Sequence, residues 1–244
     1  MNLPLFNLDK IKFGVDERTF QKALALYEIG RVTNFGNNGF SFTADVLGSR
    51  PYKVVVLRKK FNEGNCECYL GQNETLCKHM VAVAIYAVLG GREIKEEERK
   101  QVTKPEVSGV VGELNTEELK KVKEEIIYAL KFIKYYSGPS KTWFAYQDSL
   151  WEGKNRLSSI ISKLPISKQT ADLIIGVLLR LDKKIQNGVD DSDGTVGGFI
   201  EETVDILKDF PKYDAKIIES FKKLAGISSC FGWEESLVKM ITEN

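Results

Sequence analysis

Histidine and cysteine are scarce in this chain, whose 244 residues include one histidine and four cysteines. The sequence also lacks the phosphate-binding pattern GxxxxGKS/T and the nucleophile pattern GxSxG. No histidine remains for base catalysis outside the cluster described below. These absences predict that the protein is not an enzyme and has no small-molecule substrate.

Long hydrophobic runs are missing as well. No apolar stretch approaches the roughly 18 residues that a membrane span needs. The stretch MNLPLFNLDK lacks the basic start and the continuous apolar region of a signal peptide. We therefore expect a cytoplasmic protein in a reducing compartment, with no membrane partner. Clustered thiols in such a compartment are more often metal ligands or redox groups than disulfides.

Net charge is also small, at +1, so no polyanionic or polycationic partner is required. The distribution is uneven: residues 1–92 carry 12 Lys and Arg against 8 Asp and Glu, whereas residues 93–244 carry 23 against 26. The basic first part is a weak indication of a phosphate-facing surface, and a solvated face accounts for it nearly as well.

The scarce residues are concentrated in one window, CECYLGQNETLCKH, at residues 66–79. It contains three of the four cysteines and the only histidine, arranged as C-x-C, eight residues, then C-x-H. Three thiolates and an imidazole suit one tetrahedral Zn²⁺, and a flexible polar connector joins the two pairs. All four positions are filled by protein ligands, which predicts a structural zinc at Cys66, Cys68, Cys77 and His79.

Four alternatives to a zinc site fit the cluster less well. A redox dithiol is usually C-x-x-C beside a βαβ unit, and neither is visible. A catalytic Cys–His pair would have to use His79, which lies among three thiols. An iron–sulfur site with a histidine ligand is chemically possible but less common, and a chance cluster of buried cysteines around a core histidine is the simplest alternative.

The pattern C-x-C…C-x-H followed by the apolar stretch CKHMVAVAIY resembles the SWIM-type zinc finger. The resemblance extends upstream to GRVTNFGNNGFSFTADVLGSRPYKVVVLRK and covers roughly residues 25–90. It implies that Cys66, Cys68, Cys77 and His79 are the zinc ligands. It also implies binding to DNA or to other proteins, since the family occurs in chromatin-remodelling ATPases, transposases and recombination accessory proteins.

The residues themselves predict a small ββα unit around the metal. In GFSFTADV the residues Phe40, Phe42, Ala44 and Val46 alternate with polar ones, as in a half-buried strand. A second strand is expected at residues 53–60, and an apolar helix at 79–89 that stops at Gly90. A further helix at residues 16–29 precedes these strands.

Beyond residue 92 the pattern changes. Residues 93–115 are charged and then Pro/Gly-bearing, which is typical of a linker. Helical periodicity follows, with helices expected at residues 116–137, 141–163, 167–187, 197–209, 214–225 and 233–243. The predicted fold class is therefore α+β: a zinc-finger domain at 1–92, a linker at 93–115 and an all-helical domain at 116–244, either a bundle or a short helical array.

Three features of the helical domain are expected to have structural roles. The aromatic residues between 132 and 151 are expected to be mostly core, although aromatics among lysines can also stack on bases. The loop VDDSDG does not match a calcium loop, so Asp190, Asp191 and Asp193 are expected to form a turn and cap the next helix. Cys230 is expected to be a buried small hydrophobe.

The leading hypothesis is a zinc-binding accessory protein that binds DNA or a protein partner, such as a DNA-remodelling ATPase or a recombinase. The chain itself has no ATPase or transposase core. The alternatives are a protein–protein adaptor without nucleic-acid contact and, less well supported, an enzyme that uses the acidic loop. The candidate phosphate contacts are Arg31, Arg50, Lys53, Arg58, Lys59, Lys60 and Lys78.

Overall fold

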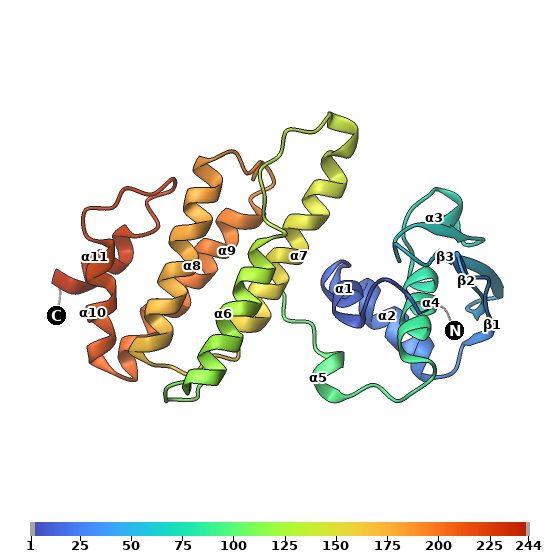
Figure 1. The fold of residues 1–244 in the computed structure, drawn as a ribbon, viewed down its shortest axis with the longest axis horizontal. Coiled ribbons are helices and arrows are strands. Elements are labelled where there is room, and N and C mark those ends of the chain that lie inside the picture. The colour runs from blue at the N-terminus through green and yellow to red at the C-terminus, as the bar shows by residue number, and fades with distance from the viewer. Residues whose placement is uncertain (1–2, 243–244) are drawn as a thin grey trace. The chain divides into compact units, whose positions relative to one another are not determined.

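A computed structural model describes residues 3–242, and the chain divides into two compact units, Met1–Gln101 and Val102–Asn244 (Figure 1). The first unit contains a small antiparallel sheet with helices, and the second is helical. The fold is α+β, as predicted. The boundary between the units lies inside the segment predicted as a linker.

The sheet of the first unit is a meander in the order β1-β2-β3-β4. Its strands are β1 (Val32–Asn37), β2 (Ser41–Leu47), β3 (Pro51–Leu57) and β4 (Gly64–Cys66), and every neighbouring pair is antiparallel. The β1–β2 and β3–β4 turns therefore lie at one end of the sheet, and the β2–β3 turn lies at the other.

Strand β2 confirms most of the predicted alternation, since Phe42, Ala44 and Val46 are buried. The prediction was wrong for Phe40, which lies in the turn before β2 and is 86% exposed. The side-chain oxygen of Asn38 accepts hydrogen bonds from the backbone N–H groups of Phe40 and Ser41, at 3.0 and 2.8 Å. This Asx-type turn takes Phe40 out of the strand pattern.

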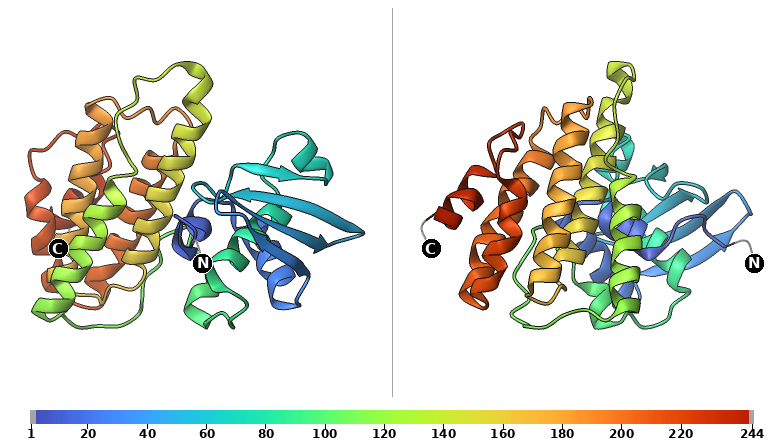
Figure 2. Two further views of the ribbon diagram at one scale, coloured as in Figure 1. Left: turned by 45° about the vertical axis from the view of Figure 1, so that its right-hand side comes forward. Right: turned by 60° about the vertical axis from the view of Figure 1, so that its left-hand side comes forward.

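The helices of the first unit are α1 (Leu8–Phe13), α2 (Glu17–Glu28), α3 (Tyr69–Gln72), α4 (Lys78–Leu89) and α5 (Glu96–Arg99). Helix α4 packs against α2 and against one face of the sheet, which the left view of Figure 2 shows more openly than the right view. It is apolar nearly all round because it is enclosed on both sides. Gly90 ends it in the left-handed conformation, with φ of 62°, as predicted.

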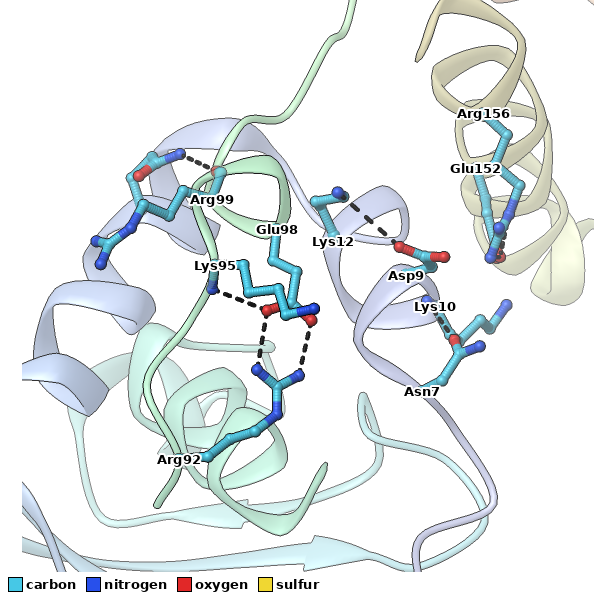
Figure 3. A network of polar contacts seen from close by, with 11 residues as sticks. Asn7, Asp9, Lys10, Lys12, Arg92, Lys95, Glu98, Arg99, Glu152 and Arg156 are labelled. Carbon is cyan, nitrogen blue, oxygen red and sulfur yellow. Dashed lines mark hydrogen bonds and ion pairs between the residues drawn. The ribbon is translucent and has the colours of Figure 1, made fainter. Parts of the chain in front are cut away.

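Residues 92–101 are tied to the first unit (Figure 3). The guanidinium of Arg92 donates two hydrogen bonds to the carboxylate of Glu98, at 2.9 and 2.7 Å. The backbone N–H of Lys95 donates to the same carboxylate at 2.9 Å. Arg99 forms an ion pair with Glu28, and the side chain of Ile94 is buried in the core of this unit.

The second unit contains the main helices α6 (Thr116–Leu130), α7 (Trp143–Ile161), α8 (Lys168–Gln186), α9 (Thr195–Asp209), α10 (Ile218–Phe221) and α11 (Glu235–Thr242). Short 3-10 turns lie at Ser140–Thr142, Phe210–Lys212, Ala215–Ile217 and Lys222–Leu224. Each predicted helix has a counterpart, but α6 stops at Leu130 rather than near residue 137. Helix α6 packs on α7, and α8 packs on α9 and α10. Within residues 3–242, no helix is both long and apolar enough to cross a membrane.

Candidate metal centre

The four predicted ligands come from three consecutive pieces of the first unit. Cys66 ends β4, and Cys68 is the N-cap residue of α3. Cys77 is the N-cap residue of α4, and His79 lies in the first turn of that helix. All four side chains are buried. The loop between the two pairs folds back so that both pairs face one point.

Their geometry fits a single ion. The four candidate ligand atoms all lie within 4.8 Å of one another. His79 Nδ1 is 3.8 Å from Cys66 Sγ and 3.9 Å from Cys77 Sγ. A tetrahedral zinc with bonds of about 2.3 Å separates its ligand atoms by roughly 3.7 Å. Three sulfurs and one nitrogen at this spacing would hold zinc with Nδ1 as the histidine ligand, and they leave no coordination position for water.

Gly71 allows the loop to close around the centre. A Cβ atom at this position would overlap the carbonyl oxygen and the Cβ of Cys66. The Gly71 backbone N–H also points to Cys68 Sγ, at 3.4 Å, where it can stabilise a thiolate. The close approach of α3 to the end of β4 therefore requires a residue without a side chain.

Tyr52 and Gly48 surround the imidazole on its other sides. The Tyr52 ring lies 4.7 Å from the His79 ring, centroid to centroid, and its hydroxyl is 2.8 Å from Ser49 Oγ. A Cβ atom on Gly48 would lie 3.2 Å from His79 Nε2. That nitrogen is buried and has no hydrogen-bond partner within residues 3–242. On the Nε2 side, packing rather than a polar contact thus orients the ring.

Two of the thiols interact strongly with each other. The hydrogen bond from Cys66 lowers the pKa of Cys77 to about 4, and the same contact, together with burial, raises the pKa of Cys66. The pair therefore shares a proton when no cation is present. A bound zinc replaces that proton with positive charge, so metal binding releases protons and is weakened by acid.

The chain thus carries a closed Cys3His centre of the kind found in structural zinc fingers. The comparison with protein families agrees with this geometry, since residues 52–87 match the SWIM zinc finger model. The matched residues run from Tyr52 through the four ligands into α4. Searches of curated proteins and of solved structures returned no match for the chain.

The seven basic residues predicted as phosphate contacts are divided between the two ends of the sheet. Arg50 lies in the β2–β3 turn, with its guanidinium 5.3 Å from the centre of the Tyr52 ring. Arg31 is at the same end, since its carbonyl accepts a hydrogen bond from Leu47 N. Lys78 is the first residue of α4 and lies between the predicted ligands Cys77 and His79. Lys53 on β3 lies opposite Asp45 on β2 in the strand register. We call Arg31, Arg50 and Lys78 the zinc-end cations.

Arg58, Lys59 and Lys60 lie at the opposite end, about 20 Å away along seven-residue strands. Arg58 Nε donates to the carbonyl of Leu3 at 2.7 Å, and Lys60 forms an ion pair with Glu63 at 2.5 Å. Within residues 3–242, only Lys59 of the three lacks a side-chain partner.

Apolar side chains surround that second group. Backbone hydrogen bonds join Arg58 to Phe40 and to Leu5, so three separate segments meet there. The side chains of Leu3, Leu5 and Leu57 are 71%, 61% and 38% exposed. We call Leu3, Leu5, Phe40 and Leu57 the apolar end of the sheet. No sequence pattern indicated this cluster, because its members come from three segments that are distant along the chain.

A shallow cleft of about 580 Å³ lies beside the metal loop. Its lining residues are Asn62, Glu63, Gly64, Asn65, Gly71, Gln72, Glu74 and Met80. The lining includes two carboxylates and no basic residue, so this side of the finger is unsuited to phosphate.

The acidic loop of the helical unit has a structural role. Asp191 accepts hydrogen bonds from the backbone N–H groups of Val196 and Gly197, at 2.6 and 2.7 Å, and so caps α9. Asp190 accepts from Trp143 Nε1 at 2.9 Å. The two hydrogen bonds accepted by Asp191 confirm the prediction that the acidic loop caps the following helix.

Two predictions for this unit were wrong. Cys230 is exposed rather than buried, in a loop that is held by a hydrogen bond from its own N–H to Asp182 at 2.8 Å. The aromatic residues are less buried than expected, since Tyr135, Phe144 and Trp151 are exposed and only Tyr146 is fully buried. The early end of α6 leaves Tyr135 in the loop of residues 134–139, whereas Phe144 and Trp151 lie on exposed positions of α7.

Proposed function

We propose that this protein is a non-enzymatic accessory factor whose zinc-stabilised finger binds a macromolecular partner, either DNA or a protein such as a DNA-remodelling ATPase or a recombinase. The observation that supports this most directly is the closed and buried donor set. Four protein ligands leave no open position for a substrate or a catalytic water, so zinc would serve to fix the shape of the finger.

Duplex DNA is the first candidate partner, because the finger carries the basic excess of the chain. The zinc-end cations lie on the side where zinc fixes the backbone. A surface with a few phosphate contacts binds weakly, depends little on sequence, and loses affinity with salt at a slope near −0.9 per contact.

A protein partner is the second candidate, and the apolar end of the sheet favours it. Four exposed apolar side chains around Arg58 form a patch that a soluble monomer seldom leaves uncovered. The hydrogen bond from Arg58 to the Leu3 carbonyl and the ion pair between Lys60 and Glu63 also reduce the positive charge available to phosphate at this end. In this alternative the protein is an adaptor that does not contact nucleic acid.

The two candidates are separated by titrating labelled duplex DNA with the full-length protein at low and at physiological salt. Two double variants, Lys59→Glu/Lys60→Glu and Arg50→Glu/Lys78→Glu, remove charge from the two ends separately. Lys22→Glu, an exposed change on α2, is the control, and zinc content is measured for each protein. DNA binding predicts a salt-sensitive complex that one double variant abolishes and the control preserves.

If the unmodified protein does not bind at low salt, or if both double variants bind as well as it does, DNA is not the partner. The adaptor function then predicts a protein complex that survives nuclease and is lost with Phe40→Ser/Leu57→Ser. Loss of both interactions in zinc-loaded, folded protein would contradict the proposed function as a whole.

A further inference from the structure

The helical unit contains a groove that no residue between 3 and 242 occupies. It lies between α6 and α8, which are neighbours in Figure 1, and has a volume of about 380 Å³. The residues that line it recur at helical spacing, with Leu119, Lys123, Ile126 and Ile127 on α6 and Leu173, Gly176, Val177 and Arg180 among those on α8. Helix α6 packs on α7 and α8 packs on α9 and α10, so the two walls have their main contacts elsewhere.

Gly176 opens the floor of this groove. It lies in the middle of α8, where glycine is the poorest residue for helix stability apart from proline. A Cβ atom added to it would have no atom within 4 Å. Gly153 in α7 is different, because its Cβ would lie 2.7 Å from Ile133 Cγ1. Close packing explains why position 153 has no side chain, but no neighbouring atom explains why position 176 has none.

The walls of the groove are apolar and its rim is basic. Ile127 is 50% exposed, and Ile126 and Val177 form buried parts of the walls. Lys123 and Arg180 form no ion pair within residues 3–242. The one carboxylate in the lining, Asp172, is neutralised by Lys168 at 3.3 Å and by Lys223 at 2.9 Å.

Basic residues continue along α8 from the rim of the groove toward the C-terminal end of the helix. A second hollow shares Arg180 with the first and adds Lys183 and Lys184, together with the apolar side chains of Leu130 and Val189. Lys184 is engaged, because its Nζ donates to the carbonyl of Ile133 at 2.6 Å. From Gln169 to Asn187 the two hollows follow α8 for about 27 Å, or five helical turns.

We propose that the α6/α8 groove binds an acidic amphipathic helix of a partner protein. Two parallel helical walls with an apolar floor match the helix-in-groove mode of recognition. The missing side chain at Gly176 lets the backbone of the incoming helix approach closely. Lys183, like Lys123 and Arg180, forms no ion pair within the described residues, and these three cations select a helix with carboxylates beside its apolar face. This site does not depend on the function proposed for the finger.

The test uses the full-length protein and two synthetic helical peptides of about five turns. Both carry leucine on one face, and the remaining positions are mainly glutamate in one peptide and lysine in the other. We expect the glutamate peptide to bind at least about 10-fold more tightly. Gly176→Leu, which fills the groove, and Lys123→Glu/Arg180→Glu, which reverses its rim, should each weaken it by a similar factor.

Gly176→Ala and Gly198→Ala provide a matched pair, since a Cβ on Gly198 in α9 also has no atom within 4 Å. Both changes should raise Tm by about 2–4 °C. Only Gly176→Ala should also weaken peptide binding, because only Gly176 lies in the groove.

Three results would overturn the proposal. The first is equal binding of the two peptides, and the second is binding of the glutamate peptide that Gly176→Leu leaves unchanged. The third is a dimer in sedimentation experiments that Gly176→Leu dissociates, because the groove would then be an interface between two copies of this chain. None of these results depends on zinc or on DNA binding by the finger.

Discussion

The ring of Tyr52 lies against the imidazole of His79, with centroids 4.7 Å apart and ring planes inclined by 30°. Tyr52 belongs to β3 and His79 to the first turn of α4, so this contact joins the sheet to the metal-binding helix. It turns Nδ1 toward the sulfurs of Cys66 and Cys77. The orientation of the ligand therefore depends on a residue that the ligand pattern does not include.

Tyr52→Ala should lower zinc affinity by about 10–100-fold, the usual effect of losing a group that orients a ligand. Tyr52→Phe should restore most of it, because the ring remains and only the contact with Ser49 Oγ is lost. Competition with a chromophoric chelator measures both. Equal affinities for the alanine and phenylalanine variants would show that the ring contact is not needed.

Gly71→Ala should destabilise the first unit by about 1–3 kcal/mol, the usual cost of forcing a group into a packed site. The added methyl group would overlap the backbone and Cβ of Cys66, so β4 or α3 must move. Leu70→Ala, an exposed neighbour, is the control and should change stability little. Urea unfolding of the zinc-loaded proteins gives the comparison, and a neutral Gly71→Ala would argue against this packing.

The contact between Arg92 and Glu98 should make stability depend on pH in acid. Hydrogen bonds from Arg92 and from the backbone of Lys95 lower the pKa of Glu98 from 4.5 to about 2. The carboxylate is thus favoured in the folded state, so its contribution is complete above pH 4.5 and is lost as the pH falls toward 2. The effect should be small because the pair is partly exposed.

The measurement compares the unmodified protein with Glu98→Gln above and within that interval. The difference in unfolding free energy between the two proteins should shrink as the pH falls. Zinc content is measured at each pH, and the comparison uses only the pH values at which both proteins retain zinc, because the first unit is expected to unfold without it. A difference that stays constant with pH would mean that Glu98 is not held in its charged form.

Asp191→Ala should cost the helical unit about 1–2 kcal/mol, because two N–H groups at the start of α9 lose their acceptor. Asp193→Ala is the comparison and should cost less, since Asp193 accepts from only one backbone N–H of α9, that of Thr195, and from the Thr195 hydroxyl. Addition of Mg²⁺ or Ca²⁺ should not change the stability of either protein. A strong stabilisation by either cation would instead identify the loop as a metal site.

The metal centre was accessible to sequence reasoning because its information is local. Cys66, Cys68, Cys77 and His79 lie within one window, and the spacing alone indicates that they converge. The long helices were also predictable, since their apolar periodicity extends over several turns. The ligand spacing and the apolar periodicity are both formed by residues close in sequence, so both can be recognised without knowing the tertiary fold.

The rest of the finger depends on contacts between distant residues. Strand β1 was not predicted because a bulge interrupts its alternation at Asn34, which has a φ of 52°. Strand β4 is only three residues long and pairs with β3 across a turn. Such elements are stabilised by their neighbours in the sheet rather than by their own pattern.

The arrangement of the predicted basic residues also depends on the tertiary fold. Arg50 and Arg58 are close in sequence, but strand β3 separates them and places them at opposite ends of the sheet. The exposed position of Phe40 follows from the Asn38 turn, which overrides the alternation of β2. Charge counts along the chain do not reveal which residues share a face.

The zinc content and folding of two single cysteine variants test most directly whether zinc holds the finger together. The unmodified protein should contain about one zinc per chain, and its first unit should unfold when a chelator removes the ion. Cys77→Ser should lose the metal and the structure of that unit, whereas Cys230→Ser, at the one cysteine outside the centre, should keep both. Metal analysis and circular dichroism of the same samples give the result. A metal-free Cys77→Ser protein with an intact first unit would contradict a structural role for zinc.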